Sequence, residues 1–208
     1  MRPVNEKLAS DILEAGKREF LEKGFAGVNM RSLASSLGVT TGAIYRYYSD
    51  KEELFSALVD GPAMELVERY RRVQKEFAAQ ELQAQVAGLP EVSEDGQAWM
   101  MSFIYDNFDA FKLITCCAAG TRYEHYTDIL AEIETESGIR MVSQMREAGY
   151  VVQPMDDELI HMVSTMLFNG IFETVRHDMP REKAMAHMTT LKDFYSAGWF
   201  KILGIKEA

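Results

Sequence analysis

The side chains best suited to chemistry in this sequence are ones that can contact a nucleic acid, and they gather within residues 30 to 51. Small side chains at Thr41, Gly42 and Ala43 would let a helix approach the edges of bases in a major groove. A threonine methyl group can pack against thymine while its hydroxyl forms a hydrogen bond. The aromatic and cationic side chains that follow are better placed for phosphates: Tyr45, Arg46, Tyr47 and Lys51.

The spacing of small and apolar residues in this segment predicts two helices that cross through a tight turn. Ala34 is small where the helices would touch, and Gly38, four positions later, can take a positive φ and reverse the chain. The apolar wedge between the helices would consist of Leu33, Leu37, Val39 and Ile44. The outward face of the second helix would carry Thr40, Thr41, Gly42, Ala43, Tyr45 and Tyr47. The same spacing also fits a plain helical hairpin in a core, but such a hairpin would hold leucines rather than aromatic and cationic side chains.

The elements around this segment are all predicted to be helical, because apolar residues recur at spacings of three and four and no strand-like alternation occurs. Gly24 would stop the first helix, Asn29 would cap the second, and Ser49 with Glu52 would form a capping box. Gly61-Pro62 would kink or interrupt the fourth helix, residues 88–93 would form a loop, and Thr121 with Glu124 would open another helix. The expected helices span residues 5–23, 30–37, 41–48, 49–86, 94–111, 112–118, 122–148, 157–177 and 181–203.

Charge divides the chain into two parts. Residues 1–59 carry eight basic and eight acidic residues, so the net charge of −10 belongs to the remainder, which carries 14 and 24. A neutral amino-terminal part can still bind DNA through local cations and helix N-termini, with affinity that depends steeply on salt. We expect a DNA-binding domain at residues 1–50 and a larger helical domain at residues 51–208.

The composition argues against several other classes of protein. No apolar run is long enough for a membrane span and the amino terminus lacks a secretory signal, so we expect a cytoplasmic protein without a membrane partner. The neighbouring Cys116 and Cys117 fit buried thiols better than a disulfide or zinc site, although a redox-sensing pair stays an alternative. No histidine pair has metal-ligand spacing, and no nucleophile, phosphate-loop or di-iron motif occurs. We therefore expect no metal, no cofactor and no enzyme activity.

Adaptable methionine and aromatic side chains are abundant between residues 94 and 179. Each could fill a helical core, but together they are suited to lining a cavity for a bulky apolar ligand. The surplus of carboxylates suggests a lipophilic cation, although most of Glu124, Asp128, Glu132, Glu134 and Glu136 are expected to form a solvated face. The candidate ligand-binding residues are Met101, Tyr105, Phe108, Tyr123, Tyr126, Met145, Met162, Phe168 and Phe172.

Residues 9–58 resemble the amino-terminal domain of the TetR family of transcription regulators. The resemblance rests on Gly24-Phe25, Asn29-Met30-Arg31, Leu33-Ala34, Leu37-Gly38-Val39 and the run from Gly42 to Leu54. It implies phosphate contacts at Asn29, Tyr45 and Lys51, and base contacts at Thr41, Gly42, Ala43 and Tyr47. Thr41 replaces a frequent lysine of the family and Tyr48 a frequent phenylalanine, so the operator sequence cannot be transferred from relatives.

The resemblance also implies the partners and the mechanism. A homodimer formed by the last two helices of each subunit would bind palindromic double-stranded operator DNA. Together with the residues above, the candidate DNA-binding residues are Asn29, Arg31, Thr40, Thr41, Gly42, Ala43, Tyr45, Arg46, Tyr47 and Lys51. An unidentified small-molecule effector in the larger domain would release the DNA. Two alternatives stay open, namely a DNA-binding regulator whose larger domain only dimerises or binds a protein, and a helical-bundle enzyme.

Overall fold

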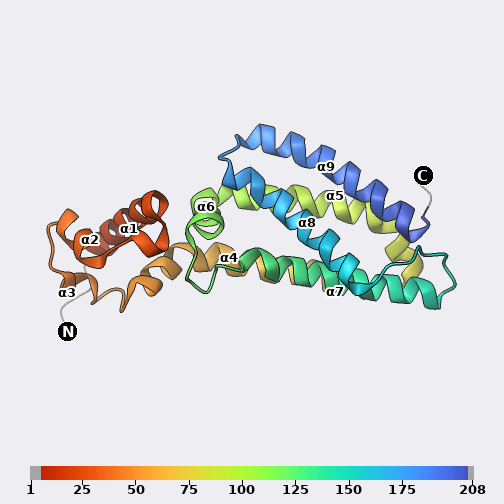
Figure 1. Ribbon diagram of the computed structural model, residues 1–208, viewed down its shortest axis with the longest axis horizontal. Helices are drawn as coiled ribbons and strands as arrows, with labels where there is room; N and C mark the ends of the chain where they lie inside the picture. Colours follow the sequence, from red (N-terminus) through yellow and green to blue (C-terminus); the bar gives the residue numbers. More distant parts are fainter. Residues whose placement is uncertain (1–5, 206–208) are drawn as a thin grey trace. The chain divides into compact units, whose positions relative to one another are not determined.

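The computed structural model describes residues 6–205, without the side chains of residues 89–95 and 97 (Figure 1). Within that range every regular element is a helix, which confirms the expected all-α class. None of these helices combines the length and the apolar character that crossing a membrane requires. In chain order the helices are α1 (Glu6–Gly27), α2 (Met30–Ser36), α3 (Thr41–Ile44), α4 (Lys51–Ala78), α5 (Leu82–Asp106), α6 (Phe108–Cys117), α7 (Tyr126–Glu147), α8 (Asp157–Arg176) and α9 (Arg181–Leu203).

The described residues form two compact units. Unit 1 consists of the chain up to Glu65 together with Asn107–Tyr126, and unit 2 consists of Leu66–Asp106 and the chain from Thr127 onward. Compared with the expected division after residue 50, unit 1 also takes in the first half of α4 and all of α6. Helix α6 belongs there because it packs against α1, with Lys17 and Asp109 forming an ion pair of 3.1 Å.

The core of unit 1 is aromatic. The Phe55 ring meets those of Phe20 and Phe25 edge to face, with centroids 5.1 and 5.6 Å apart, while Phe20 and Phe25 stack on each other at 6.0 Å. Edge-to-face contact places the positive ring edge on the negative ring face, which adds to the gain from burial. Tyr123 extends this cluster beside Phe55, and Tyr126 donates a hydrogen bond of 2.8 Å to the Ala63 carbonyl.

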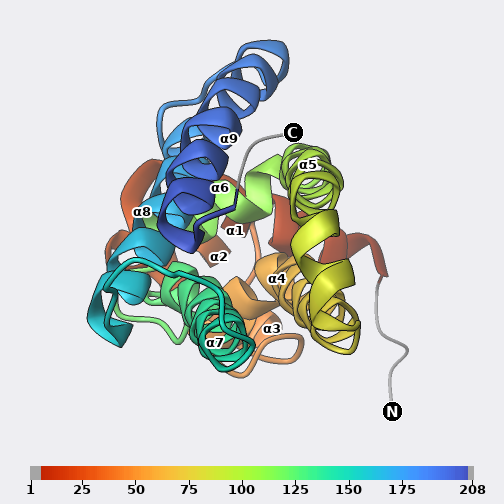
Figure 2. The ribbon, with the colours of Figure 1, turned by 90° about the vertical axis from the view of Figure 1, so that its right-hand side faces the viewer.

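Unit 2 is a bundle of long helices, seen from the side in Figure 1 and end-on in Figure 2. Helix α9 packs against α5 and α8. A buried cluster joins the end of α7, the start of α8 and the end of α9, and consists of Met141, Val142, Met145, Met155, Ile160 and Leu203. Helices α8 and α9 have nearly the expected bounds, and Asp156 caps α8 by accepting a hydrogen bond of 2.9 Å from the Leu159 amide.

Several expected helix boundaries were wrong. Helix α4 continues through Gly61-Pro62, and residues 88–93, expected to be a loop, lie inside α5. The chain instead leaves the helical conformation between α4 and α5, at residues 79–81. A single proline need not end a helix that packing holds on both sides. The expected loop at residues 88–93 was therefore wrong, and at Gly61-Pro62 the helix is not interrupted.

Two capping predictions also need correction. The box before α4 lies one residue later than expected, since Asp50 accepts from the Glu53 amide at 2.7 Å and Glu53 accepts from the Ser49 amide at 2.5 Å. Thr121 and Glu124, expected to form a capping box, instead form hydrogen bonds within the turns that precede α7. Thr121 donates to the Ala118 carbonyl at 2.7 Å, and α7 begins only at Tyr126.

Candidate functional site

The turn between α2 and α3 has the geometry that its sequence predicts. Gly38 takes φ +67°, and its amide donates to the Ser35 carbonyl while the Val39 amide donates to Ala34, at 3.1 and 3.0 Å. These two bonds form a Schellman motif, which satisfies carbonyls at the helix end and needs a left-handed residue. Leu33, Ala34 and Ile44 are fully buried between the helices, as expected for the wedge, whereas Leu37 and Val39 are half-buried.

Both helices of this motif begin at side-chain caps. Asn29 accepts a hydrogen bond of 2.8 Å from the Arg31 amide, and Thr40 accepts one of 3.2 Å from the Ala43 amide. Helix α3 is shorter than expected, because the α-helix ends at Ile44 and residues 45–47 form turns. The turns keep the chain compact after α3, with the Tyr47 amide donating to the Ile44 carbonyl at 2.9 Å.

The outward face of α3 is open to solvent. Thr40, Gly42 and Arg46 are exposed, and the Tyr45 side chain is 49% exposed although it is large and aromatic. Asn29 and Arg31 are also exposed, at the start of α2. Thr41, Ala43 and Tyr47 are half-buried. No neighbouring atom lies within 4 Å of a Cβ built on Gly42, so the surface above α3 is unobstructed.

Lys51 has a structural role at the start of α4. Its ammonium group donates hydrogen bonds of 2.7 and 3.3 Å to the carbonyls of Phe25 and Val28, and lies 4.2 Å from the centroid of the Phe25 ring. These contacts join the end of α1 to the start of α4. The expected phosphate contact of Lys51 stays a prediction, and binding DNA would require the ammonium to share or leave these partners.

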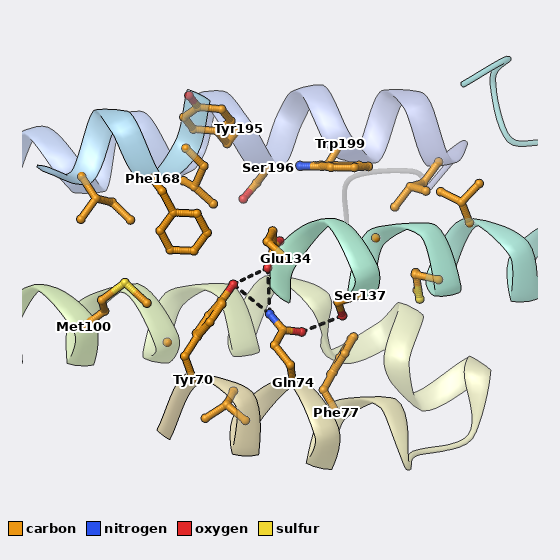
Figure 3. A pocket seen from close by; sticks show the side chains of 18 of the residues that line it. Tyr70, Gln74, Phe77, Met100, Glu134, Ser137, Phe168, Tyr195, Ser196 and Trp199 are labelled. Carbon is orange, nitrogen blue, oxygen red and sulfur yellow. Dashed lines mark hydrogen bonds between the residues drawn. The ribbon is translucent and has the colours of Figure 1, made fainter. Parts of the chain in front are cut away.

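Unit 2 contains a cavity of about 180 Å³ between α4, α5, α7, α8 and α9 (Figure 3). Its wall is rich in aromatic rings, namely Tyr70, Phe77, Trp99, Phe168, Tyr195, Trp199 and Phe200. Aliphatic and methionine side chains complete the apolar part, including Met100, Met141, Val142, Leu167 and Ile171. A mostly apolar wall with few polar groups is typical of sites for small organic molecules.

The polar part of this wall is one connected cluster around Glu134, which we call the Glu134 cluster: Tyr70, Gln74, Glu134 and Ser137 (Figure 3). The Tyr70 hydroxyl donates to Oε2 of Glu134, which also accepts from the Gln74 amide group at 2.8 Å. Ser137 donates to Oε1 of Gln74 at 2.7 Å. Burial raises the pKa of the Glu134 carboxyl, and the Tyr70 hydrogen bond partly opposes this rise. The pKa of Tyr70 is also raised, first by burial and then by Glu134, so its hydroxyl is a donor.

Comparison with known proteins identifies the amino-terminal part of the chain. Residues 12–58 match the family model described as "Bacterial regulatory proteins, tetR family". This segment contains α2, α3 and the capping residues described above. The amino-terminal domain belongs to the TetR family.

Relatives of known type match about a third of this chain. A helix-turn-helix transcriptional regulator of Mycobacterium bovis is 32% identical over 78 residues, which are 38% of this chain and 33% of the relative. The helix-turn-helix transcriptional repressor AcnR of Corynebacterium efficiens is 39% identical over 67 residues, 32% of this chain and 35% of the relative. The matches therefore span about a third of each relative's length.

Solved structures match the fold over nearly the whole chain. The ketosteroid transcriptional regulator KstR2 of Mycobacterium tuberculosis has a TM-score of 0.53 at 20% identity, covering 99% of this chain and 98% of that one. The fatty acid degradation regulator FadR of Bacillus halodurans has a TM-score of 0.53 at 16% identity, covering 89% and 96%. At these identities the likeness concerns the fold alone.

Most residues expected to bind a ligand lie away from the cavity. Of the nine, Phe168 lines it. Phe108, Tyr123 and Tyr126 belong to unit 1 with the TetR-family domain, and Met162 is 60% exposed on α8. Buried positions in the core of unit 2 hold Met101, Met145 and Phe172, and half-buried Tyr105 donates to the Met179 carbonyl at 2.8 Å.

Glu134 is the cavity residue that sequence reasoning placed wrongly, since we expected it on a solvated face. Its neighbours Glu132 and Glu136 are exposed, but Glu134 lines the cavity. The helical period contains the signal: Leu130, Glu134 and Met141 follow one another at spacings of four and seven, and both apolar members are buried. A carboxylate at an inward position of this period indicates a polar group within the bundle.

Proposed function

We propose that this chain is a sequence-specific DNA-binding regulator of transcription, acting as a repressor in the cytoplasm rather than as an enzyme. The observation that carries the proposal is the open face of α3 within a TetR-family domain. Large and polar side chains are exposed there while Leu33, Ala34 and Ile44 hold the two helices together. Small side chains at Thr41, Gly42 and Ala43 would approach the bases, and Asn29, Arg31, Tyr45 and Arg46 the phosphates.

Helix α8 supports a homodimer, because apolar residues occupy two of its faces. Phe168, Ile171 and Val175 are buried within the subunit. On another face Leu159, Met162 and Met166 are 40, 60 and 54% exposed, and on α9 Phe194 is 69% exposed. Exposed apolar side chains at helical spacing indicate a contact with another protein surface. A twofold pair built on α8 and α9 would present two DNA-binding domains to a palindromic operator, one helical turn of about 34 Å apart.

The cavity is the proposed effector site, for a small apolar or cationic molecule. Tyr70, Val73, Gln74 and Phe77 of α4 line it, while Leu54 and Phe55, at the start of the same helix, are buried in unit 1. A ligand that displaced α4 would thereby change the separation of the two DNA-binding domains. Ligand and operator would then weaken each other's binding by the same factor, typically corresponding to about 1 to 3 kcal/mol.

The test of this function is a pair of substitutions on the α3 face, measured by fluorescence anisotropy with the duplex that the protein selects. Tyr45→Ala should weaken binding to all sequences alike, because a phosphate contact carries no sequence information. Thr41→Ala should change which base is preferred at one position of each half-site. Wild-type affinity and base preference in both variants would contradict the assignment of this face.

A further inference from the structure

The carboxyl group of Glu134 has only neutral hydrogen-bond donors around it. Its Oε2 atom accepts from the Tyr70 hydroxyl and, at 2.8 Å, from the Gln74 amide group. Among the residues that the structure describes, no lysine, arginine or histidine forms an ion pair with it. A charged group taken out of water without a counter-ion is costly, and this cost is what raises the pKa of Glu134.

Two basic side chains that contact residues of the cavity wall have other partners than Glu134. Arg140 donates at 3.3 Å to Ser137, at the end of the Glu134 cluster farthest from the carboxylate. Arg69 is exposed, and its guanidinium carbon lies 3.9 Å from the centroid of the Trp99 ring. Neither side chain donates a hydrogen bond to Glu134. Within the described part of the chain, the cavity thus has a carboxylate with no basic side chain as its counter-ion.

The rest of the cavity wall suits a cation as well. Trp99, Trp199, Phe168, Tyr195 and Tyr70 contribute aromatic rings, whose negative faces attract cations, most strongly in surroundings without water. In Figure 3, Phe168, Tyr195 and Trp199 lie across the cavity from α4, with the Glu134 cluster between them and that helix. A ligand between the two walls would contact both the carboxylate and the aromatic faces.

The size of the cavity limits the ligand. A dry cavity of about 150 Å³ lined by apolar side chains accepts benzene, and this cavity measures about 180 Å³. We propose that the cavity binds a small aromatic or otherwise apolar organic cation, such as a substituted ammonium of about ten heavy atoms, and that Glu134 is its counter-ion. The proposal rests on the proposed function only in treating this cavity as the effector site.

The chain carries its own probe for this proposal. It has two tryptophans, and both line the cavity, so its tryptophan fluorescence comes from the cavity wall alone. The full-length protein would be titrated with phenyltrimethylammonium and with tert-butylbenzene, which share one shape and differ in charge. Tryptophan fluorescence and titration calorimetry would give both affinities. Because an apolar cavity also favours the neutral probe, the informative quantity is the ratio of the two affinities in each variant.

Glu134→Gln removes the charge but keeps the size of the side chain and an oxygen that can accept from Tyr70. Glu136→Gln is the matched control, since Glu136 is exposed two residues later on α7, on another face of the helix. We expect wild type and Glu136→Gln to bind the cation saturably with one molecule per subunit and with the same ratio. In Glu134→Gln the ratio should fall by about tenfold or more, which corresponds to about 1.4 kcal/mol, because the cation loses its counter-ion.

An unchanged ratio in Glu134→Gln would overturn the proposal, and so would an absence of saturable cation binding to wild type. Both results are independent of the proposed function, because DNA binding is measured separately on the same preparations. If the protein selects a DNA site but the ratio of the two probe affinities is the same in Glu134→Gln as in wild type, only this inference is refuted. A charge-selective cavity in a protein that binds no DNA would refute only the proposed function.

Discussion

Lys51 and Glu134 are two charged side chains that the fold holds with neutral partners. The Lys51 ammonium donates to the Phe25 and Val28 carbonyls, at the end of α1 and just beyond it. The Glu134 carboxylate accepts from a hydroxyl and an amide inside an apolar cavity. The first arrangement joins α1 to α4 and contributes stability, whereas in the second burial raises the pKa of the carboxyl.

For Lys51 we predict a loss of stability in addition to any loss of DNA affinity. Lys51→Met keeps the contact with the Phe25 ring but removes both hydrogen bonds, so the free energy of unfolding should fall by about 1 to 2 kcal/mol. Lys75→Met, at an exposed position near the end of α4, is the control and should change it by less than about 0.5 kcal/mol. Urea denaturation measures both, and equal stabilities of the two variants would show that Lys51 is not a structural link.

For Glu134 we predict a characteristic dependence of stability on pH. Its pKa is raised in the folded chain, so the folded state binds more protons than the unfolded state in the pH range between the two pKa values. The Glu134 contribution to stability is therefore largest below the unfolded value of about 4.3, and it is lost as pH rises through the folded pKa.

Glu134→Gln has no such titration, so its free energy of unfolding should exceed that of wild type by an amount that grows from about pH 4.3 upward and then levels off. The difference should reach about 1 to 3 kcal/mol, the usual penalty for a poorly compensated buried polar group. Urea denaturation between pH 4 and 8, with Glu136→Gln as the control, measures it. A difference that does not vary with pH would contradict the account of the carboxyl.

Within the α2–α3 motif, substitutions at two glycines should have different effects on the stability of the protein and on its DNA binding. Gly38 has φ +67°, so Gly38→Ala should cost about 1 kcal/mol of stability in urea denaturation. Gly42 has ordinary helical geometry and open space around it, so Gly42→Ala should leave stability unchanged or raise it by about 0.5 to 1 kcal/mol. Gly42→Ala should nevertheless weaken DNA binding by placing a methyl group at the groove. The opposite order of stabilities would exclude this geometry.

Some helix boundaries could be predicted from the sequence, whereas others and the cavity could not. Asn29 and Gly38 act within a few residues of the chain, so the start of α2 and the turn after it could be predicted from residue type alone. Pro62 and the proline within residues 88–93 were misleading, since α4 and α5 are uninterrupted there and local propensity is only a weak guide to where a helix ends. The cavity was the least predictable feature, since it depends on which faces of five helices meet, and of the nine candidate residues only Phe168 lines it.

At the scale of the whole molecule, we predict that α8 carries the dimer contact. Met166→Glu would place a carboxylate at a twofold interface, twice per dimer, and should weaken the dimer by about 3 kcal/mol or more. Met64→Glu is the control, because Met64 is 57% exposed on α4, as Met166 is 54% exposed on α8. Analytical ultracentrifugation over a range of concentrations should show dimers for wild type and Met64→Glu, and monomers for Met166→Glu. A stable dimer in that variant would remove α8 from the proposed interface.

In the proposed function the protein binds DNA as a dimer, and the exposed face of α3 in each subunit contacts the bases. The most direct test is selection of bound sequences from a random duplex library, with wild type and Gly42→Glu run in parallel. Gly42→Glu adds a negative charge at an exposed position where a Cβ meets no neighbouring atom, so the variant should fold normally. We predict that wild type enriches a palindromic site and that Gly42→Glu enriches none. Absence of enrichment by wild type at low salt, or the same enriched site with both proteins, would contradict the account.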